Sequence, residues 1–123
     1  MPVGVEAAAT PVGATFLPAD LDAERRVLGI LLKYPDRADI VMDRLRPAHF
    51  YDRLHRLVYE AIVEEYNLTG RVSFTQVFQR LRRRPELAEP EELLLELTEA
   101  FGTAAELEPA VEVLLDKHAR RRI

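Results

Sequence analysis

From Asp20 onward, apolar residues recur at intervals of three and four positions, which is the spacing of one face of an α-helix. No stretch alternates apolar and polar residues for long enough to indicate a strand. Proline, glycine and small polar residues interrupt the pattern repeatedly, so each helix is short. The sequence therefore predicts an all-α domain, a compact bundle of about six short helices around a central helix.

The first predicted helix, from Asp20 to about Tyr34, is apolar around most of its circumference. Asp20 is suited to cap its amino-terminal end. A helix with so wide an apolar arc is normally surrounded by neighbours. We therefore expect it to be the central helix. Its expected core residues are Val27, Leu28, Gly29 and Leu31.

Five further helices follow from the same periodicity and from residues that start or stop helices, such as Pro90 and the capping residue Ser73. We expect these helices at about 35–45, 47–67, 73–84, 90–101 and 104–123. Their expected core residues are Phe50, Leu54, Leu57, Val58 and Phe78.

Residues 1–19 differ from the rest of the chain, because they are rich in Ala, Val, Thr, Gly and Pro and carry no sustained periodicity. Their prolines and glycines would interrupt any helix. We predict a flexible N-terminal arm over 1–19, followed by one helical domain over 20–123. A chain of 123 residues has the length of a single domain.

Composition narrows the class of protein. Hydrophobic residues make up 48% of the chain, and the absence of cysteine excludes disulfides and cysteine-ligated metals. A net charge of −4 argues against a protein that coats nucleic acid, so we expect any DNA contact to be weak or absent.

No run approaches the ~18 apolar residues of a membrane span, and the N-terminus lacks a signal-peptide pattern. We expect a cytoplasmic protein with no membrane partner.

Catalytic chemistry finds little support in the sequence. The five glycines are too scattered to form a phosphate-binding loop, so we expect no cofactor in this chain. His49 and His55 are six positions apart and fall on different faces of a helix, while His118 lies in an apolar stripe. We therefore expect no metal site. The carboxylates sit at helix starts and on solvated faces. We expect no catalytic residue and no enzyme activity in this chain alone.

The densest basic cluster consists of Arg80, Arg82, Arg83 and Arg84. Cations at a helix carboxyl end stabilise the helix dipole, and no aromatic residues alternate with them to stack bases. The cluster therefore favours a structural role over a phosphate or nucleic-acid contact.

The helix predicted at 47–67 offers a candidate partner surface. Tyrosine and histidine side chains lie between its apolar stripe and its charged face. Such side chains are common at protein interfaces, although they can also simply cover a core with their polar tips in water. Leu95, on the helix predicted at 90–101, is added to this surface because it points away from the buried stripe of its own helix. The candidate surface comprises Tyr51, His55, Tyr59, Tyr66 and Leu95.

Several short blocks carry a family resemblance through their order and spacing. The blocks are Pro18, Ala23-Glu24, Val27-Leu28-Gly29, Leu45-Arg46-Pro47, Phe50-Tyr51 with His55, Gly70 with Val72 and Thr75, Thr103-Ala104-Ala105, and the basic segment from Lys117 to Arg122. From about Pro18 to Ile123, the chain resembles the N-terminal domain of bacterial replicative DNA helicases of the DnaB type.

This resemblance implies an all-helical head that assembles with copies of itself into a collar on a hexameric ring. It implies the primase C-terminal domain as a partner, and a helicase loader as a further one. It also implies that the ATPase motor, which would bind ATP and Mg²⁺, lies beyond Ile123, so that this chain is an excised domain.

We therefore expect a non-catalytic assembly and partner-docking domain of a replicative helicase. Two alternatives stay open. One is the helicase-binding C-terminal domain of a primase, whose helical head is similar in shape. The other is a small helical DNA-binding domain, against which the negative charge weighs.

Overall fold

The computed structural model describes residues 19–99 and 103–121, and over these ranges it contains α-helices and 3₁₀ helices but no strand. In chain order the elements are α2 (Leu21–Lys33), the 3₁₀ helix η1 (Pro35–Arg37), α3 (Ala38–Val41), η2 (Pro47–His49), α4 (Arg53–Thr69), α5 (Phe74–Leu81), α6 (Pro90–Glu99), η3 (Ala104–Glu106) and α7 (Leu107–Arg121). The predicted all-α class is confirmed. The predicted arm lies outside the described residues except for Ala19, which is buried.

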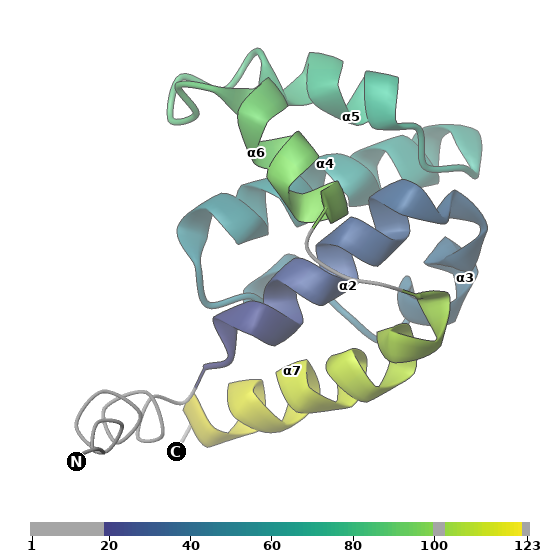
Figure 1. Ribbon diagram of the computed structural model, residues 1–123, viewed down its shortest axis with the longest axis vertical. Coiled ribbons are helices and arrows are strands. Elements are labelled where there is room, and N and C mark those ends of the chain that lie inside the picture. The colour runs from purple at the N-terminus through teal and green to yellow at the C-terminus, as the bar shows by residue number, and fades with distance from the viewer. Residues whose placement is uncertain (1–18, 100–102, 122–123) are drawn as a thin grey trace.

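The helix α2 occupies the middle of the molecule, with α7 along one side and α4, α5 and α6 on the other (Figure 1). Its amino-terminal cap is as predicted, because the Asp20 side chain accepts a hydrogen bond from the Ala23 N–H at 3.0 Å. Its predicted core residues are buried, and Val27, Leu28 and Leu31 are fully so. The wide apolar arc thus does identify the central helix.

The long helix α4 begins later than the sequence predicts. Residues 47–49 form the separate 3₁₀ turn η2, and Phe50 is extended. Asp52 then caps α4, since its carboxylate accepts from the backbone N–H groups of Leu54 at 2.8 Å and His55 at 3.0 Å. The cap fixes the start of the helix more strongly than the apolar periodicity upstream of it. At the other end, Gly70 terminates α4 with φ of 78°.

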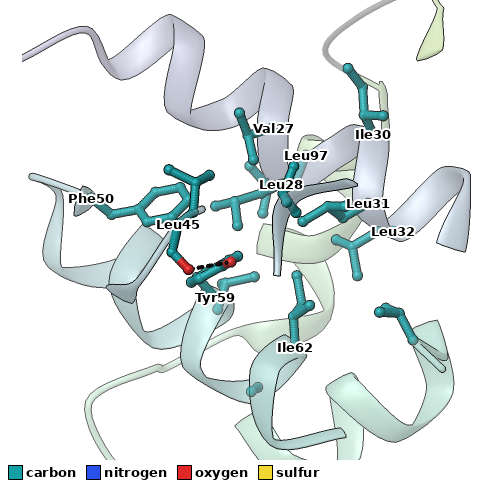
Figure 2. Close-up of a cluster of buried hydrophobic side chains, with 14 of the residues drawn as sticks. Val27, Leu28, Ile30, Leu31, Leu32, Leu45, Phe50, Tyr59, Ile62 and Leu97 are labelled. Carbon is teal, nitrogen blue, oxygen red and sulfur yellow. Dashed lines mark hydrogen bonds between the residues drawn. The ribbon is translucent and has the colours of Figure 1, made fainter. Parts of the chain in front are cut away.

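The core forms where α2 meets α4, α6 and α7 (Figure 2). Of the predicted core positions in the later helices, Phe50, Leu57 and Val58 are buried as expected. Two predictions were wrong. Leu54 is 39% exposed, because it lies in the first turn of α4, at the margin of the core. Phe78 is only partly buried and packs at the core's edge, with the Arg82 guanidinium 5.7 Å from its ring centre.

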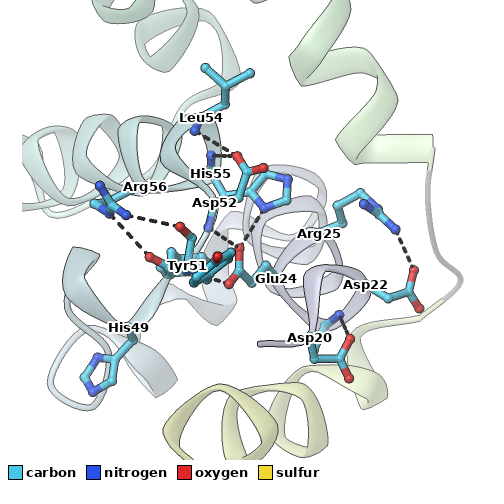
Figure 3. Close-up of polar contacts among 12 residues, drawn as sticks. Asp20, Asp22, Glu24, Arg25, His49, Tyr51, Asp52, Leu54, His55 and Arg56 are labelled. Atoms are coloured by element: carbon cyan, nitrogen blue, oxygen red, sulfur yellow. Dashed lines mark hydrogen bonds and ion pairs between the residues drawn. The ribbon is translucent and has the colours of Figure 1, made fainter. Parts of the chain in front are cut away.

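A fully buried carboxylate joins α2 to the start of α4 (Figure 3). Glu24 accepts hydrogen bonds from the backbone N–H groups of Tyr51 at 2.6 Å and Asp52 at 3.2 Å. Its Oε1 also lies 2.8 Å from Nδ1 of His55. Burial of an ionised group is tolerated only when such partners replace water. The contacts of Glu24 therefore fix the extended segment before α4 and the first turn of that helix against α2.

The last turns of α7 are held on η2 by a second set of contacts. The Arg121 guanidinium donates to the His49 carbonyl at 3.1 Å and lies 5.5 Å from the centre of the Tyr51 ring. The His49 and His118 rings meet edge to face, with centroids 4.5 Å apart. Nδ1 of His49 accepts from the Arg46 N–H at 2.8 Å. Burial lowers the pKa of His49, and the positive charges of His118, Arg46 and Arg121 lower it further.

We expect Glu24→Ala to destabilise the domain by about 3 kcal/mol or more, because buried donors lose their acceptor. Glu24→Gln keeps one acceptor oxygen and should cost less. Urea unfolding followed by circular dichroism measures both. The matched control is Asp22→Ala, in the first turn of the same helix, whose carboxylate forms only exposed ion pairs with Arg25 and Arg26. A loss from Glu24→Ala no larger than that of the control would contradict the role given to Glu24.

The lowered pKa of His49 predicts the direction of a pH effect. The folded domain binds a proton at His49 less readily than the unfolded chain does, so this stabilisation is complete above the unfolded pKa of about 6.5. It is lost progressively as the pH falls below that value. Unfolding free energies at pH 7.5, 6.5 and 5.5 should therefore decline less in His49→Gln, which keeps an acceptor for the Arg46 N–H. Equal declines in the two proteins would refute the prediction.

Candidate interaction surface

The partner surface predicted along α4 is not one surface. Tyr59 is fully buried, and its hydroxyl donates to the Leu45 carbonyl at 2.9 Å (Figure 2). Burial raises the pKa of that hydroxyl far above its usual range, so it stays neutral. His55 is also buried, against Glu24. The prediction was wrong for both residues, because η2 and the chain before it cover the side of α4 that periodicity assigns to the rim.

Tyr51 is the member of the predicted surface that remains well exposed near the start of α4, at 47%. Its backbone is fixed on both sides, since Glu24 accepts from its N–H and the Arg56 guanidinium donates to its carbonyl at 3.1 Å. The Arg121 guanidinium lies over one face of the ring. Tyr51 is therefore an exposed aromatic group with a restricted orientation, which is favourable for a protein contact.

The other two predicted residues lie elsewhere. Tyr66 is half-buried near the end of α4, 13 residues beyond Arg53 and so about 20 Å along the helix axis. Its hydroxyl donates to the Asp39 carboxylate, and this hydrogen bond raises the pKa of Tyr66. Leu95 lies on α6 and is 46% exposed, as the sequence predicts. Neither residue extends a continuous patch from Tyr51.

Two of the four arginines in the basic cluster at the end of α5 are paired with carboxylates of α4. Arg80 pairs with Glu64 at 3.3 Å and with the buried Glu65 at 3.2 Å, and Arg84 pairs with Glu60 at 3.1 Å. The structural interpretation is therefore supported for Arg80 and Arg84, where carboxylates of the neighbouring helix, more than the helix dipole, explain it. Arg82 and Arg83 are exposed and take part in none of the ion pairs of the described residues.

The acidic residues of α6 and the segment before it were not singled out from the sequence. Glu89, Glu92 and Glu96 take part in none of the ion pairs formed by the described residues. They line a shallow groove together with the exposed Leu54. A hydrogen bond with Glu89 raises the pKa of Glu92, and the charges of Glu89 and Glu96 act in the same direction. The available signal was a run of acids at 86–99 with no base among them.

Residues 19–99 and 103–121 contain neither a metal-binding cluster nor a membrane-spanning helix. No three His, Asp or Glu side chains there are placed to hold a metal ion. The helices of this part of the chain are also too short or too polar to cross a membrane.

Residues 17–116 match the family described as DnaB-like helicase N terminal domain. The replicative DNA helicase DnaB of Rhodothermus marinus is 32% identical over 108 residues, which are 86% of this chain but 12% of that protein. The DnaB of Mycobacterium leprae is 39% identical over 67 residues, covering 54% of this chain and 11% of that protein. The chain thus spans a small part of the length of these relatives.

A solved structure agrees with these relatives. The crystal structure of the N-terminal domain of DnaB helicase from Mycobacterium tuberculosis has a TM-score of 0.77 to this chain, with 33% sequence identity. The alignment covers 86% of this chain and 77% of that one. Family match, relatives and fold agree, and the chain therefore belongs to the family of DnaB-like helicase N-terminal domains.

Proposed function

We propose that this domain is a non-catalytic assembly and docking part of a hexameric replicative DNA helicase, acting in the cytoplasm. It contributes to the N-terminal collar through contacts with copies of itself, and it docks the C-terminal domain of primase. A helicase loader is a further proposed partner. ATP and Mg²⁺ belong, in this proposal, to a motor domain outside the 123 residues.

One observation carries the docking part of the proposal. Beside a well-packed core, the described residues expose four large apolar side chains, Tyr51, Leu54, Leu68 and Leu95. Isolated exposed leucines are ordinary, but Tyr51 and Leu54 flank the same amino-terminal end of α4, whose backbone is fixed by Asp52 and Glu24. A rigid element that presents apolar groups pays little entropy on binding.

The two alternatives are less well supported. Membership of the helicase family favours the helicase over the helicase-binding domain of a primase. A DNA-binding domain requires basic groups that are available to phosphates. In the densest basic cluster Arg80 and Arg84 are paired with carboxylates of α4, and the whole chain carries a net charge of −4.

Binding of the purified chain to the primase C-terminal domain from the same genome tests the docking proposal by isothermal titration calorimetry. We expect Tyr51→Ala to weaken binding by about tenfold, because an aromatic anchor is lost. Leu68→Ala, at the opposite end of α4 and 74% exposed, serves as the control. Absence of binding by the wild-type chain would contradict primase docking, whereas unchanged binding by Tyr51→Ala would contradict only the assigned contact. Tyr59→Ala is unsuitable for this test, because it removes a core side chain.

The same chain should show no salt-dependent affinity for DNA. Fluorescence anisotropy with a labelled single-stranded oligonucleotide at low ionic strength measures this, since phosphate contacts are strongest there. An affinity that falls steeply as salt is added would instead favour the DNA-binding alternative.

A further inference from the structure

The groove beside Leu54 combines apolar groups with a rim of carboxylates. Its apolar residues come from the first turn of α4, from the segment before α6 and from α6 itself: Leu54, Leu87, Ala88 and Leu93. The acidic residues that line it are Glu86, Glu89, Glu92 and Glu96. Leu87 is buried and Leu93 partly buried, so the 39% exposed Leu54 is the most accessible apolar side chain of the three leucines.

Negative charge is concentrated in the segment that contributes most of this groove. The segment 85–99 contains six of the 21 acidic residues of the chain and none of its 17 lysines and arginines. The remaining residues therefore carry a net charge of +2, although the whole chain carries −4. Within the described residues, the ion pair that reaches this groove is the exposed one between Arg53 and Glu86, at 3.4 Å. Four of these six carboxylates line the groove, and Arg82 lines a neighbouring hollow together with Glu89 and Glu92. The groove lining itself is therefore net negative.

The carboxylates also face in a common direction. Glu89, Glu92 and Glu96 are spaced by three and four positions, which places them along one side of α6 and its first turn. The charges of Glu89 and Glu96 act to raise the pKa of Glu92, and all three residues line the same groove. Like charges held this close repel each other, and a cation placed between them would relieve the repulsion.

We propose that this groove docks a helix of a partner protein, one whose apolar ridge is flanked by lysines or arginines. The proposal rests on the proposed docking function and names the chemistry of the partner. The apolar ridge would cover Leu54 and Leu93, and the basic side chains would pair with Glu89, Glu92 and Glu96.

The geometry favours this occupant over others. The described part of the chain offers no sheet edge to which an extended peptide could add, so a helix in a groove is the recognition mode that fits. A bound divalent cation does not explain the central leucine, and no three of these carboxylates are placed to hold a metal.

A synthetic helical peptide tests the proposal directly. The probe carries leucine at alternating spacings of three and four, flanked by arginines, and its matched control replaces each arginine by glutamate. We expect the arginine peptide to shift the backbone amide resonances of Leu54, Ala88, Glu92 and Leu93, with an affinity that falls as salt is added. We expect no binding of the glutamate peptide, because the rim repels it.

Matched variants separate the apolar and the charged contributions. Leu54→Ala should weaken binding of the arginine peptide by about fivefold or more, whereas Leu68→Ala, another exposed leucine of α4, should not. Glu92→Gln should weaken it by about threefold and reduce its dependence on salt. Glu108→Gln removes one charge from α7 instead and should leave binding unchanged.

Several results would overturn the proposal. Equal binding of the two peptides would show nonspecific apolar adhesion, and shifts confined to other helices would place the contact elsewhere. Shifts of the groove resonances on raising the chain's own concentration, or on adding Mg²⁺ alone, would assign the groove to a second copy or to an ion. If the primase domain binds without shifting the groove resonances and the peptide also fails to shift them, docking stands and the groove assignment fails. If only the peptide binds, the groove stands and primase docking fails.

Discussion

The structure depends most on one buried carboxylate. Glu24 is in the central helix, where apolar neighbours would make an unpartnered charge prohibitively costly. It is satisfied by two backbone N–H groups at residues 51 and 52 and by His55, all contributed by the segment that opens α4. The need of Glu24 for partners therefore determines where α4 starts on α2. Tyr51 and Leu54, the exposed groups at that end of α4, owe their positions to this constraint.

Periodicity and capping residues predicted most of the helical framework, because both act locally. The apolar arc of α2 and its Asp20 cap, and the Ser73 cap of α5, depend only on neighbouring residues and agree with the structure. Where α4 begins could not be read from periodicity, since Asp52, Pro47 and the distant Glu24 compete there. The contacts of Glu24 come from 27 and 28 positions away, so no local pattern reveals them.

The candidate surface was harder to predict than the fold, for a reason that Tyr59 and Leu54 illustrate. The angular position of a residue around a helix axis predicts whether it is buried only when the neighbouring elements all pack against one side of that helix. The turn η2 adds a neighbour beside Tyr59 and buries it, while the first turn of α4 lacks complete cover and leaves Leu54 at the surface. The exposure of Tyr51 and Leu95 and the partly buried position of Tyr66 agree with the sequence, whereas the burial of Tyr59 and His55 does not.

Pairing between helices also decides where charge accumulates. The acids of α4 face the arginines that follow in and after α5, and Glu60, Glu64 and Glu65 are neutralised by Arg80 and Arg84. The acids of α6 form no such ion pairs within the described residues, although Arg82 lines a neighbouring hollow together with Glu91 and Glu92. The run of acids at 86–99 is visible in the sequence, but packing decides which acidic segments find arginine partners. The helix α4 therefore has two roles. Its glutamates pair with Arg80 and Arg84, and its Leu54 lies in the groove that is lined by the glutamates of α6 and the segment before it.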